Sequence, residues 1–243
     1  MTIIALDSSG LVASVALLVN GEIRAEYSVN YKKTHSQTLL PMLDEIIRMT
    51  EMELNDIDAI AVAAGPGSFT GLRIGSATAK GLGLALNKPL IAVPTLEGLA
   101  YNCYGTEEVI CPMMDARRSQ VYTGSYQFKN NEFNVLQEQA VISVEECINR
   151  LNQLQMPVVF LGDGVEPYTE QIHELVKVPY RFAPAHMNRQ RASSVAIRGL
   201  CLAEAGQVVS ADAFAPEYLR MSQAERERAE KLKQQEQKEE CND

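Results

Sequence analysis

A glycine-rich turn between an apolar strand and a helix constrains the fold of this chain more than any other segment. Residues 57–62 read IDAIAV, which predicts a buried strand, and residues 76–86 read SATAKGLGLAL, which predicts a helix. Between them, residues 63–75 read AAGPGSFTGLRIG. Such a turn can hold a phosphate on free backbone N–H groups, or its glycines can let another backbone pass close by. What the protein does depends largely on which of these two uses the turn has.

The elements around the turn predict a mixed sheet. Strands at residues 2–7, 11–19 and 21–29 form an antiparallel meander, because Asn20-Gly21 favours a two-residue hairpin. They are followed by a helix at about 36–51, a strand at 57–63, a helix at 71–86, a strand at 89–93 and a short helix ending near residue 101. This order is that of the ribonuclease-H-like fold, whose duplicated form is the two-lobed actin/Hsp70-like (ASKHA) architecture.

A second unit that begins near Val109 repeats this order with a shorter helical layer. Its predicted strands cover residues 110–115, 120–128, 135–142 and 158–161, and its helix covers residues 143–153. We therefore predict an α/β protein of two lobes. The N-terminal lobe comprises residues 1–105 plus about 190–220, closed by a helix at 192–206; the reduced C-terminal lobe comprises residues 106–189; and residues 221–243 form a charged tail.

Composition excludes several classes of function. The formal net charge of −9 argues against independent nucleic-acid binding through clustered lysines and arginines. No apolar run approaches the ~20 residues of a membrane helix, and the first residues predict a strand rather than a secretion signal, so we expect no membrane association and a cytoplasmic protein. The three histidines lie far apart without metal-ligand spacing, so no metal site is predicted.

The glycine turn fits neither common phosphate-binding template. A P-loop reads G-x-x-x-x-G-K-[ST], but the spacing from Gly67 to Gly71 is too short, and Leu72 and Arg73 stand where lysine and serine or threonine are needed. The dinucleotide fingerprint reads G-x-G-x-x-G, and here the third glycine comes one residue late.

Three acidic residues, Asp7, Asp115 and Asp163, follow predicted strands. Open α/β sheets bind ligands at the carboxyl ends of their strands. In actin-like ATPases an acid in the place of Asp7 orients magnesium and water, and a nearby glycine turn holds phosphate. The residues of a candidate nucleotide cleft are therefore Asp7, Ser8, Ser9, Gly67 and Ser68. A two-metal nuclease needs convergent acids, and the spread of these three over two lobes argues against one.

Small residues recur at every fourth position along the helix at 71–86. The stripe consists of Gly71, Gly75, Ala79 and Gly83. A glycine inside a helix costs about 1 kcal/mol relative to alanine, so the stripe predicts the close approach of another backbone. The residues alone leave open whether that backbone belongs to the protein's own sheet and first helix or to another subunit.

Segments spread from residue 5 to residue 220 resemble the motifs of the TsaB (YeaZ) family, in family order. They read ALDSS (5–9), THSQ with LLP (34–37 and 39–41), GPGSFTGLRIG (65–75), MDARR with VY (114–118 and 121–122) and YLR (218–220). The resemblance implies the two-lobed actin-like fold. It also implies a role in making threonylcarbamoyladenosine beside the anticodon of ANN-decoding tRNAs in bacteria.

The resemblance also implies partners. They are a TsaD-like paralogue, which transfers the threonylcarbamoyl group, and a TsaE-like P-loop ATPase. TsaD carries a metal-binding H-x-x-x-H motif, whereas here the residue four positions after His35 is Leu39. The resemblance therefore implies a non-catalytic scaffold that activates the TsaD-like enzyme and is a homodimer when alone. It has no intrinsic cofactor, binds ATP or ADP at most at the complex interface, and reaches tRNA only through the complex.

In that family the first two helices of the N-terminal lobe form the subunit interface. Because the small-residue stripe lies on the second of these helices, the resemblance favours a contact of the stripe with another subunit. The predicted interface residues are Leu39, Leu43, Ile46, Gly71, Leu72, Gly75, Ala79 and Gly83. Two other functions stay open: an autonomous actin-like ATPase or kinase, which Asp7 and the lobes favour, and an M22-type metallopeptidase, which the missing ligands make the weakest.

Overall fold

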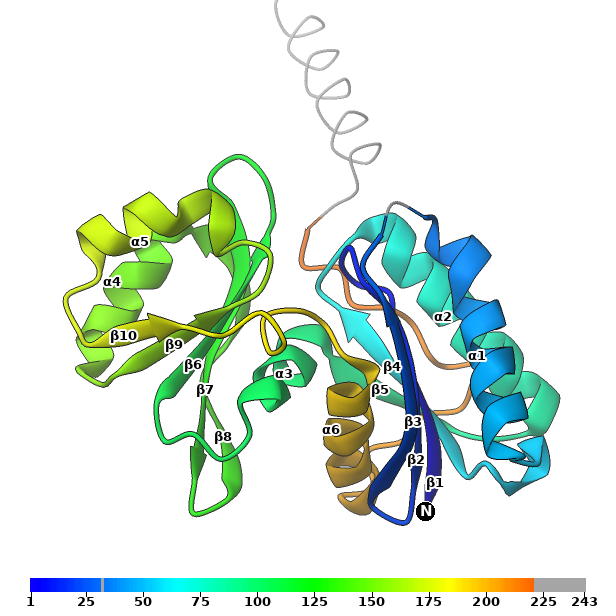
Figure 1. Cartoon of the computed structure of the whole chain (residues 1–243). Helices are drawn as coiled ribbons and strands as arrows, with labels where there is room; N and C mark the ends of the chain where they lie inside the picture. Colours follow the sequence, from blue (N-terminus) through cyan, green and yellow to red (C-terminus); the bar gives the residue numbers. More distant parts are fainter. Residues whose placement is uncertain (32, 221–243) are drawn as a thin grey trace, which may run out of the picture.

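The structure, a computed structural model, describes residues 1–31 and 33–220 and places them in two lobes, each built on its own five-stranded sheet (Figure 1). The strands of the first lobe are β1 (Thr2–Asp7), β2 (Ala13–Val19), β3 (Glu22–Val29), β4 (Ala59–Gly65) and β5 (Leu90–Pro94). Those of the second lobe are β6 (Val109–Asp115), β7 (Gln120–Lys129), β8 (Glu132–Ser143), β9 (Val158–Leu161) and β10 (Tyr180–Phe182). The charged tail predicted at 221–243 lies outside the described residues.

The two sheets have the same topology. The first has the order β3-β2-β1-β4-β5, and the second has the corresponding order β8-β7-β6-β9-β10. In each sheet the first three strands pair antiparallel, whereas the fourth and fifth are added parallel to the first. The repeated order confirms the predicted duplication and the two-lobed, actin-like α/β fold.

Helices cover the sheets in layers (Figure 1). On the first sheet, α1 (His35–Thr50) and α2 (Phe69–Leu86) lie on the outer face, and α6 (Ala192–Glu204) covers the opposite face. On the second sheet, α4 (Val144–Leu154) and α5 (Thr169–Leu175) form the outer layer. The short helix α3 (Thr95–Ala100) lies between the lobes and packs against both α6 and the second sheet.

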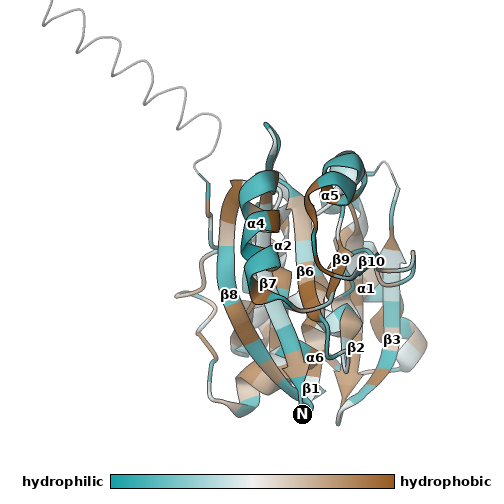
Figure 2. Ribbon diagram, turned by 90° about the vertical axis from the view of Figure 1, so that its left-hand side faces the viewer, coloured by the Kyte–Doolittle hydropathy of each residue, from teal (hydrophilic) through white to brown (hydrophobic). Residues whose placement is uncertain are grey.

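The burial of each strand explains its sequence. Strands β1 and β4 sit inside the first sheet with helices on both faces, so they are apolar almost throughout. Neighbouring residues of β1 point to opposite layers: Ile4 packs in the core under α1 and α2, and Ile3 packs in the core under α6. The edge strand β3 instead has only exposed and partly buried residues. Figure 2 shows that hydrophobic residues are common in the strands, whereas the outer side of α4 is hydrophilic.

Local signals explain where the structure differs from the predicted boundaries. Helix α2 begins two residues earlier than predicted because Ser68 is its N-cap, with the hydroxyl accepting a 3.3 Å hydrogen bond from the Gly71 N–H. Thr34 stands at the N-cap of α1, but its hydroxyl does not cap the helix. The elements α5 and β10 were not predicted, because seven and three residues are too short to show a periodic pattern. Within the described residues no helix is both long and apolar enough to cross a membrane.

Candidate functional site

The glycine turn after β4 packs directly against the turn that joins β1 to β2. The Ser68 N–H donates a 2.7 Å hydrogen bond to the carbonyl of Ser9. A Cβ atom on Gly67 would lie less than 3.0 Å from that carbonyl oxygen, and one on Gly71 would lie less than 3.0 Å from the carbonyl oxygen of Ser8. The glycines are therefore needed where two backbones touch, so this turn is a packing device.

The small-residue stripe of α2 continues the same contact inside the lobe. A Cβ atom on Gly75 would collide with the Ser8 hydroxyl, and one on Gly83 would collide with the Leu90 side chain. Ala79 is fully buried among residues of β4 and α1. The four-residue period thus reports close packing on the protein's own sheet, which is the alternative that the residues alone had left open.

The eight residues predicted for a subunit interface lie in the interior of the first lobe. All eight face inward and are at most 5% exposed where the structure gives a side-chain value. They are Leu39, Leu43, Ile46, Gly71, Leu72, Gly75, Ala79 and Gly83. A four-residue period identifies the close-packed face of a helix but does not identify what packs on it.

The opposite face of α1 and α2 is the outer surface of the first lobe (Figure 1). Three large apolar side chains are exposed there: Leu40 at 53%, Met49 at 67% and Leu84 at 56%. Ala77 and Gly81 lie between them in sequence on the exposed side of α2, and a Cβ atom on Gly81 would meet nothing within 4 Å. We call these five residues the outer α1–α2 face.

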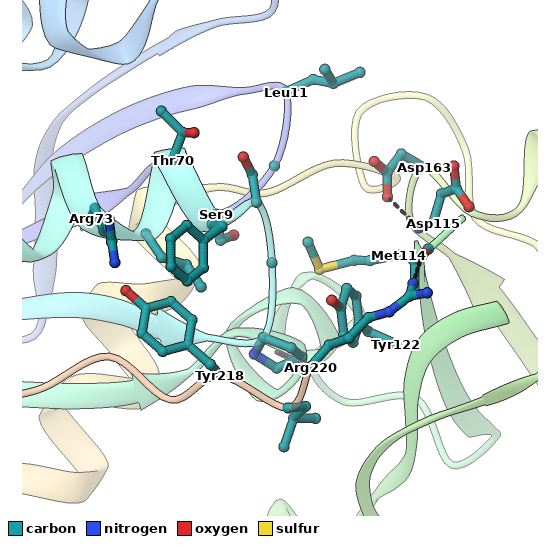
Figure 3. Close-up of a pocket in the computed structure, with 18 of the residues that line it drawn as sticks. Ser9, Leu11, Thr70, Arg73, Met114, Asp115, Tyr122, Asp163, Tyr218 and Arg220 are labelled. Carbon is teal, nitrogen blue, oxygen red and sulfur yellow. Dashed lines mark hydrogen bonds between the residues drawn. The ribbon is translucent and has the colours of Figure 1, made fainter. Parts of the chain in front are cut away.

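A cleft of about 980 Å³ lies between the lobes. Its lining comes from the β1–β2 turn, the glycine turn, the ends of β6 and β9, and residues 217–220 (Figure 3). Of the residues predicted for a nucleotide cleft, Ser9, Gly67 and Ser68 line it, whereas Asp7 and Ser8 do not. The Ser8 hydroxyl donates to the Gly71 carbonyl at 2.8 Å and is buried beneath the cleft.

The carboxylate of Asp7 is held by its own turn. Its Oδ1 accepts hydrogen bonds from the Ser9 N–H at 2.9 Å and from the Ser9 hydroxyl at 2.6 Å. The side chain is buried, and this burial raises the pKa of Asp7 to about 6. Asp7 is therefore a partner of Ser9 within the first lobe and does not reach into the cleft.

The other two acids predicted at strand ends lie together on the second lobe (Figure 3). The Asp115 N–H donates to Asp163 Oδ1 at 3.4 Å, and burial raises the pKa of Asp163. Asp115 Oδ1 also accepts from the Arg117 N–H at 2.8 Å. The three acids thus form one pair and one separate residue. No group of three or more His, Cys, Asp or Glu side chains in the described part of the chain could hold a metal ion.

His35 lies at the start of α1 and lines the cleft. Its Nε2 donates to the carbonyl oxygen of Gly10 at 2.9 Å, which fixes the ring against the β1–β2 turn. Leu39, one helical turn later, is 1% exposed and belongs to the core of the first lobe. The helix face that would carry a second ligand beside His35 is thus part of the hydrophobic core.

Residues 209–220, here called the C-terminal strap, were not predicted as part of the cleft. The strap pairs with β5 at Val209 and then crosses α2, where the Lys80 ammonium donates to the carbonyl of Phe214 at 3.0 Å. The Glu217 N–H donates to the Ala64 carbonyl at 2.7 Å, at the end of β4. Gly65 has a φ of +126°, and a Cβ atom there would collide with the Glu217 carbonyl. The YLR motif was the one sequence signal for this segment.

The last residues of the strap join the two lobes at the cleft. The ring centroids of Tyr218 and Phe69 lie 4.6 Å apart. The guanidinium carbon of Arg73 lies 4.0 Å from the centroid of the same Phe69 ring. Arg220 reaches the second lobe and donates a hydrogen bond to the Ala116 carbonyl (Figure 3). Cationic and aromatic side chains therefore surround the cleft, and sequence reasoning did not assign them to a site.

Comparisons with known proteins agree on one group of relatives. A family model described as TsaD, tRNA N6-adenosine threonylcarbamoyltransferase, matches residues 22–228. The tRNA threonylcarbamoyladenosine biosynthesis protein TsaB of Bacillus subtilis is 34% identical over 225 residues, which cover 93% of this chain and 96% of that protein. TsaB of Escherichia coli is 34% identical over 174 residues, covering 70% of this chain and 74% of that protein.

The solved structures point the same way. A Pseudomonas aeruginosa protein described as similar to the peptidase YeaZ has a TM-score of 0.79 and 30% identity, covering 90% of this chain and 99% of that one. YeaZ from Pseudomonas aeruginosa has a TM-score of 0.77 and 31% identity, with the same coverage.

Proposed function

Since this chain belongs to the TsaB family of tRNA threonylcarbamoyladenosine biosynthesis proteins, we propose that it is a non-catalytic subunit of the complex that makes this modification. It binds and activates a TsaD-like transferase, which forms threonylcarbamoyladenosine next to the anticodon of ANN-decoding tRNAs. A TsaE-like P-loop ATPase joins them. The chain works in the cytoplasm, is a homodimer when alone, and meets tRNA within the complex.

The position four residues after His35 carries the proposal. Two histidines spaced i, i+4 share one helix face and can ligate one metal ion. Here the second position is Leu39, which is buried in the core, and the His35 ring already donates to the Gly10 carbonyl. The residues of α1 therefore do not fit the metal of an H-x-x-x-H transferase. The TsaD family model thus extends over a chain that lacks that motif.

The cleft also gives little support to an autonomous ATPase. A phosphate loop needs free N–H groups, but the Ser68 N–H is bonded to Ser9 and the Gly71 N–H is bonded to the Ser68 hydroxyl. Asp7, the acid expected to orient magnesium and water, is buried against Ser9. We therefore propose no intrinsic cofactor, and we place any ATP or ADP at the interface of the complex.

The outer α1–α2 face is the surface that we propose for subunit contact. Leu40 and Met49 on α1 and Leu84 on α2 are exposed, and Figure 1 shows these two helices on the side of the first lobe that faces away from the second. An exposed leucine or methionine loses contact with water when a partner helix packs on it, which contributes about 25 cal/mol per Å² of apolar surface covered. Small residues such as Ala77 and Gly81 let the partner helix approach closely.

Calorimetric titration against the TsaD-like paralogue of the same organism tests this surface. We expect Leu84→Glu and Ala77→Arg each to weaken the heterodimer at least about tenfold, which corresponds to ~1.4 kcal/mol. The matched control is Leu136→Glu, which changes a leucine that is 37% exposed on β8 of the other lobe and should bind as the wild type does. Unchanged affinity in both test variants would show that the outer α1–α2 face is not the interface.

A further inference from the structure

The arginines of the described residues divide into two groups by their partners. Seven form ion pairs with glutamates: Arg24, Arg48, Arg150, Arg181, Arg189, Arg191 and Arg198. The other four have no carboxylate partner within residues 1–31 and 33–220: Arg73, Arg117, Arg118 and Arg220. Three of these four line the cleft between the lobes, and Arg118 is next to Arg117 on the same turn.

The turn that carries Arg117 and Arg118 has an unusual backbone. Arg117, Arg118 and Ser119 have φ angles of +63°, +55° and +56°, so three successive residues with side chains are left-handed. Each such residue costs roughly 1 kcal/mol or more. The turn is held by the Asp115 carboxylate and by a 3.0 Å hydrogen bond from the Ala116 N–H to the Gln120 carbonyl. The result is two exposed arginines on one turn, of which Arg117 lines the cleft.

The other two arginines of the cleft lining are Arg73, on α2 of the first lobe, and Arg220, in the strap, which contacts the turn at Ala116 (Figure 3). Arg73 lies over the Phe69 ring, and Arg220 donates to a backbone carbonyl, so neither positive charge is neutralised by a carboxylate. Two tyrosine rings are exposed on the same rim: Tyr31 at 72% and Tyr218 at 40%.

Acidic groups are present on the rim but are fewer than the cationic ones. Asp115, Asp163 and Glu217 line the cleft, and their described hydrogen-bond donors are all neutral groups. Arg73, Arg117, Arg220 and Lys33 line the cleft beside these three acids, in a chain whose net charge is −9. An acidic protein thus concentrates its unpaired arginines at one place, which indicates an anionic ligand there.

We propose that this arginine rim, formed by Arg73, Arg117, Arg118 and Arg220, binds a single-stranded stretch of RNA, with phosphates on the arginines and bases on the exposed tyrosines. The inference rests on the proposed function, because it gives the chain a direct contact with tRNA inside the complex. Guanidinium groups pair well with phosphate oxygens, and exposed aromatic rings stack on unpaired bases.

An RNA strand fits the rim better than a mononucleotide does. The four arginines come from α2, from the turn after β6 and from the strap. At the start of α2, the backbone N–H groups of Ser68 and Gly71 are already bonded. Because the whole chain is acidic, we expect the rim to hold RNA strongly only when the TsaD-like partner supplies further contacts.

The test uses the purified complex of this chain with its TsaD-like paralogue and a fluorescently labelled ANN-decoding tRNA transcript, with anisotropy measured over a series of KCl concentrations. We expect R117Q/R118Q to weaken tRNA binding about tenfold or more and to lower the salt slope of log K by about 1.5. R73Q, on the other lobe, should lower the slope by about 0.8. The control R24Q/R150Q also removes two exposed arginines, but from ion pairs outside the cleft, and should change neither quantity.

Unchanged binding in both R117Q/R118Q and R73Q would overturn the proposal, and so would an equal loss in the control. If these variants instead lose affinity for ATP or for a poly-glutamate peptide while tRNA binding stays at the wild-type level, the rim serves a mononucleotide or an acidic protein segment, and the RNA assignment is wrong. Calorimetry of the same variants with the paralogue separates the two claims. A failure of the wild-type chain to form the heterodimer contradicts the proposed function, whereas variants that form a normal heterodimer and bind tRNA as the wild type does contradict the arginine rim alone.

Discussion

At the scale of single residues, the positions of the three aspartates at strand ends could be predicted from the sequence, but their surroundings could not. Strand ends can be found from apolar patterns, so Asp7, Asp115 and Asp163 were correctly placed at the ends of β1 and β6 and just after β9. Their environments could not be predicted, because burial depends on which turn packs over each residue. The contacts of Asp7 with Ser9, and of Asp115 with Asp163, required the folded chain.

Asp7 should give the protein a measurable pH dependence. Its pKa in the folded state is about 6, above the ~3.9 of an unfolded chain. The folded state therefore binds more protons between these values, so the stability contributed by protonated Asp7 is present below about pH 4 and is lost as the pH rises to 6. Relative to Asp7→Asn, the wild type should lose roughly 2–3 kcal/mol of unfolding free energy over this range.

Urea unfolding at several pH values between 4 and 7 measures this difference. Asparagine keeps an oxygen that can accept from Ser9 but has no proton to lose, so the variant provides the reference curve. If the free-energy difference between wild type and Asp7→Asn does not change with pH, Asp7 is not the buried, raised-pKa carboxyl that the structure shows.

At the scale of elements, the sequence predicted most helices and strands but not their packing partners. Hairpin and periodic signals were sufficient for β1 to β9 and for the longer helices, whereas α5 and β10 are too short to produce such a signal. The stripe of α2 shows the limit most clearly. Its spacing predicted a close contact correctly, but a helical period says nothing about whether a sheet or another subunit provides that contact.

The two sides of α2 should respond oppositely to the same substitution. Gly71→Ala places a methyl group against the Ser8 carbonyl, so we expect a loss of about 2 kcal/mol or more of unfolding free energy. Gly81→Ala meets nothing within 4 Å and should be neutral or raise stability by up to ~1 kcal/mol, because alanine favours the helix. Chemical denaturation of both variants measures the two changes in unfolding free energy. Equal effects would mean that the stripe is not packed on the β1–β2 turn.

At the scale of the whole molecule, the repeat was the most predictable feature. Both lobes have the same strand order, and the second unit was visible in the sequence as a weaker copy of the first. The cleft was less predictable, because it is lined by segments as distant as the β1–β2 turn, the β6–β7 turn and the strap. Residues so far apart in sequence show no common pattern before the chain is folded.

At this scale we propose that the chain uses the fold of an actin-like enzyme as an activating subunit. The Leu39 side chain in the core and the bonded N–H groups of the glycine turn support it from two independent places. The outer α1–α2 face lies on the first lobe, whereas Arg117 and Arg118 lie on the second, so partner binding and RNA contact can be separated by substitution.

Reconstituted threonylcarbamoyl transfer to an ANN-decoding tRNA tests this claim most directly. The assay compares this chain alone, the TsaD-like and TsaE-like proteins without it, and all three together, with His35→Ala and Asp7→Asn in place of the wild-type chain. We predict that modified adenosine forms only with all three, and that both variants support it. Transfer or ATP turnover by this chain alone, lost in Asp7→Asn or His35→Ala, would contradict the account.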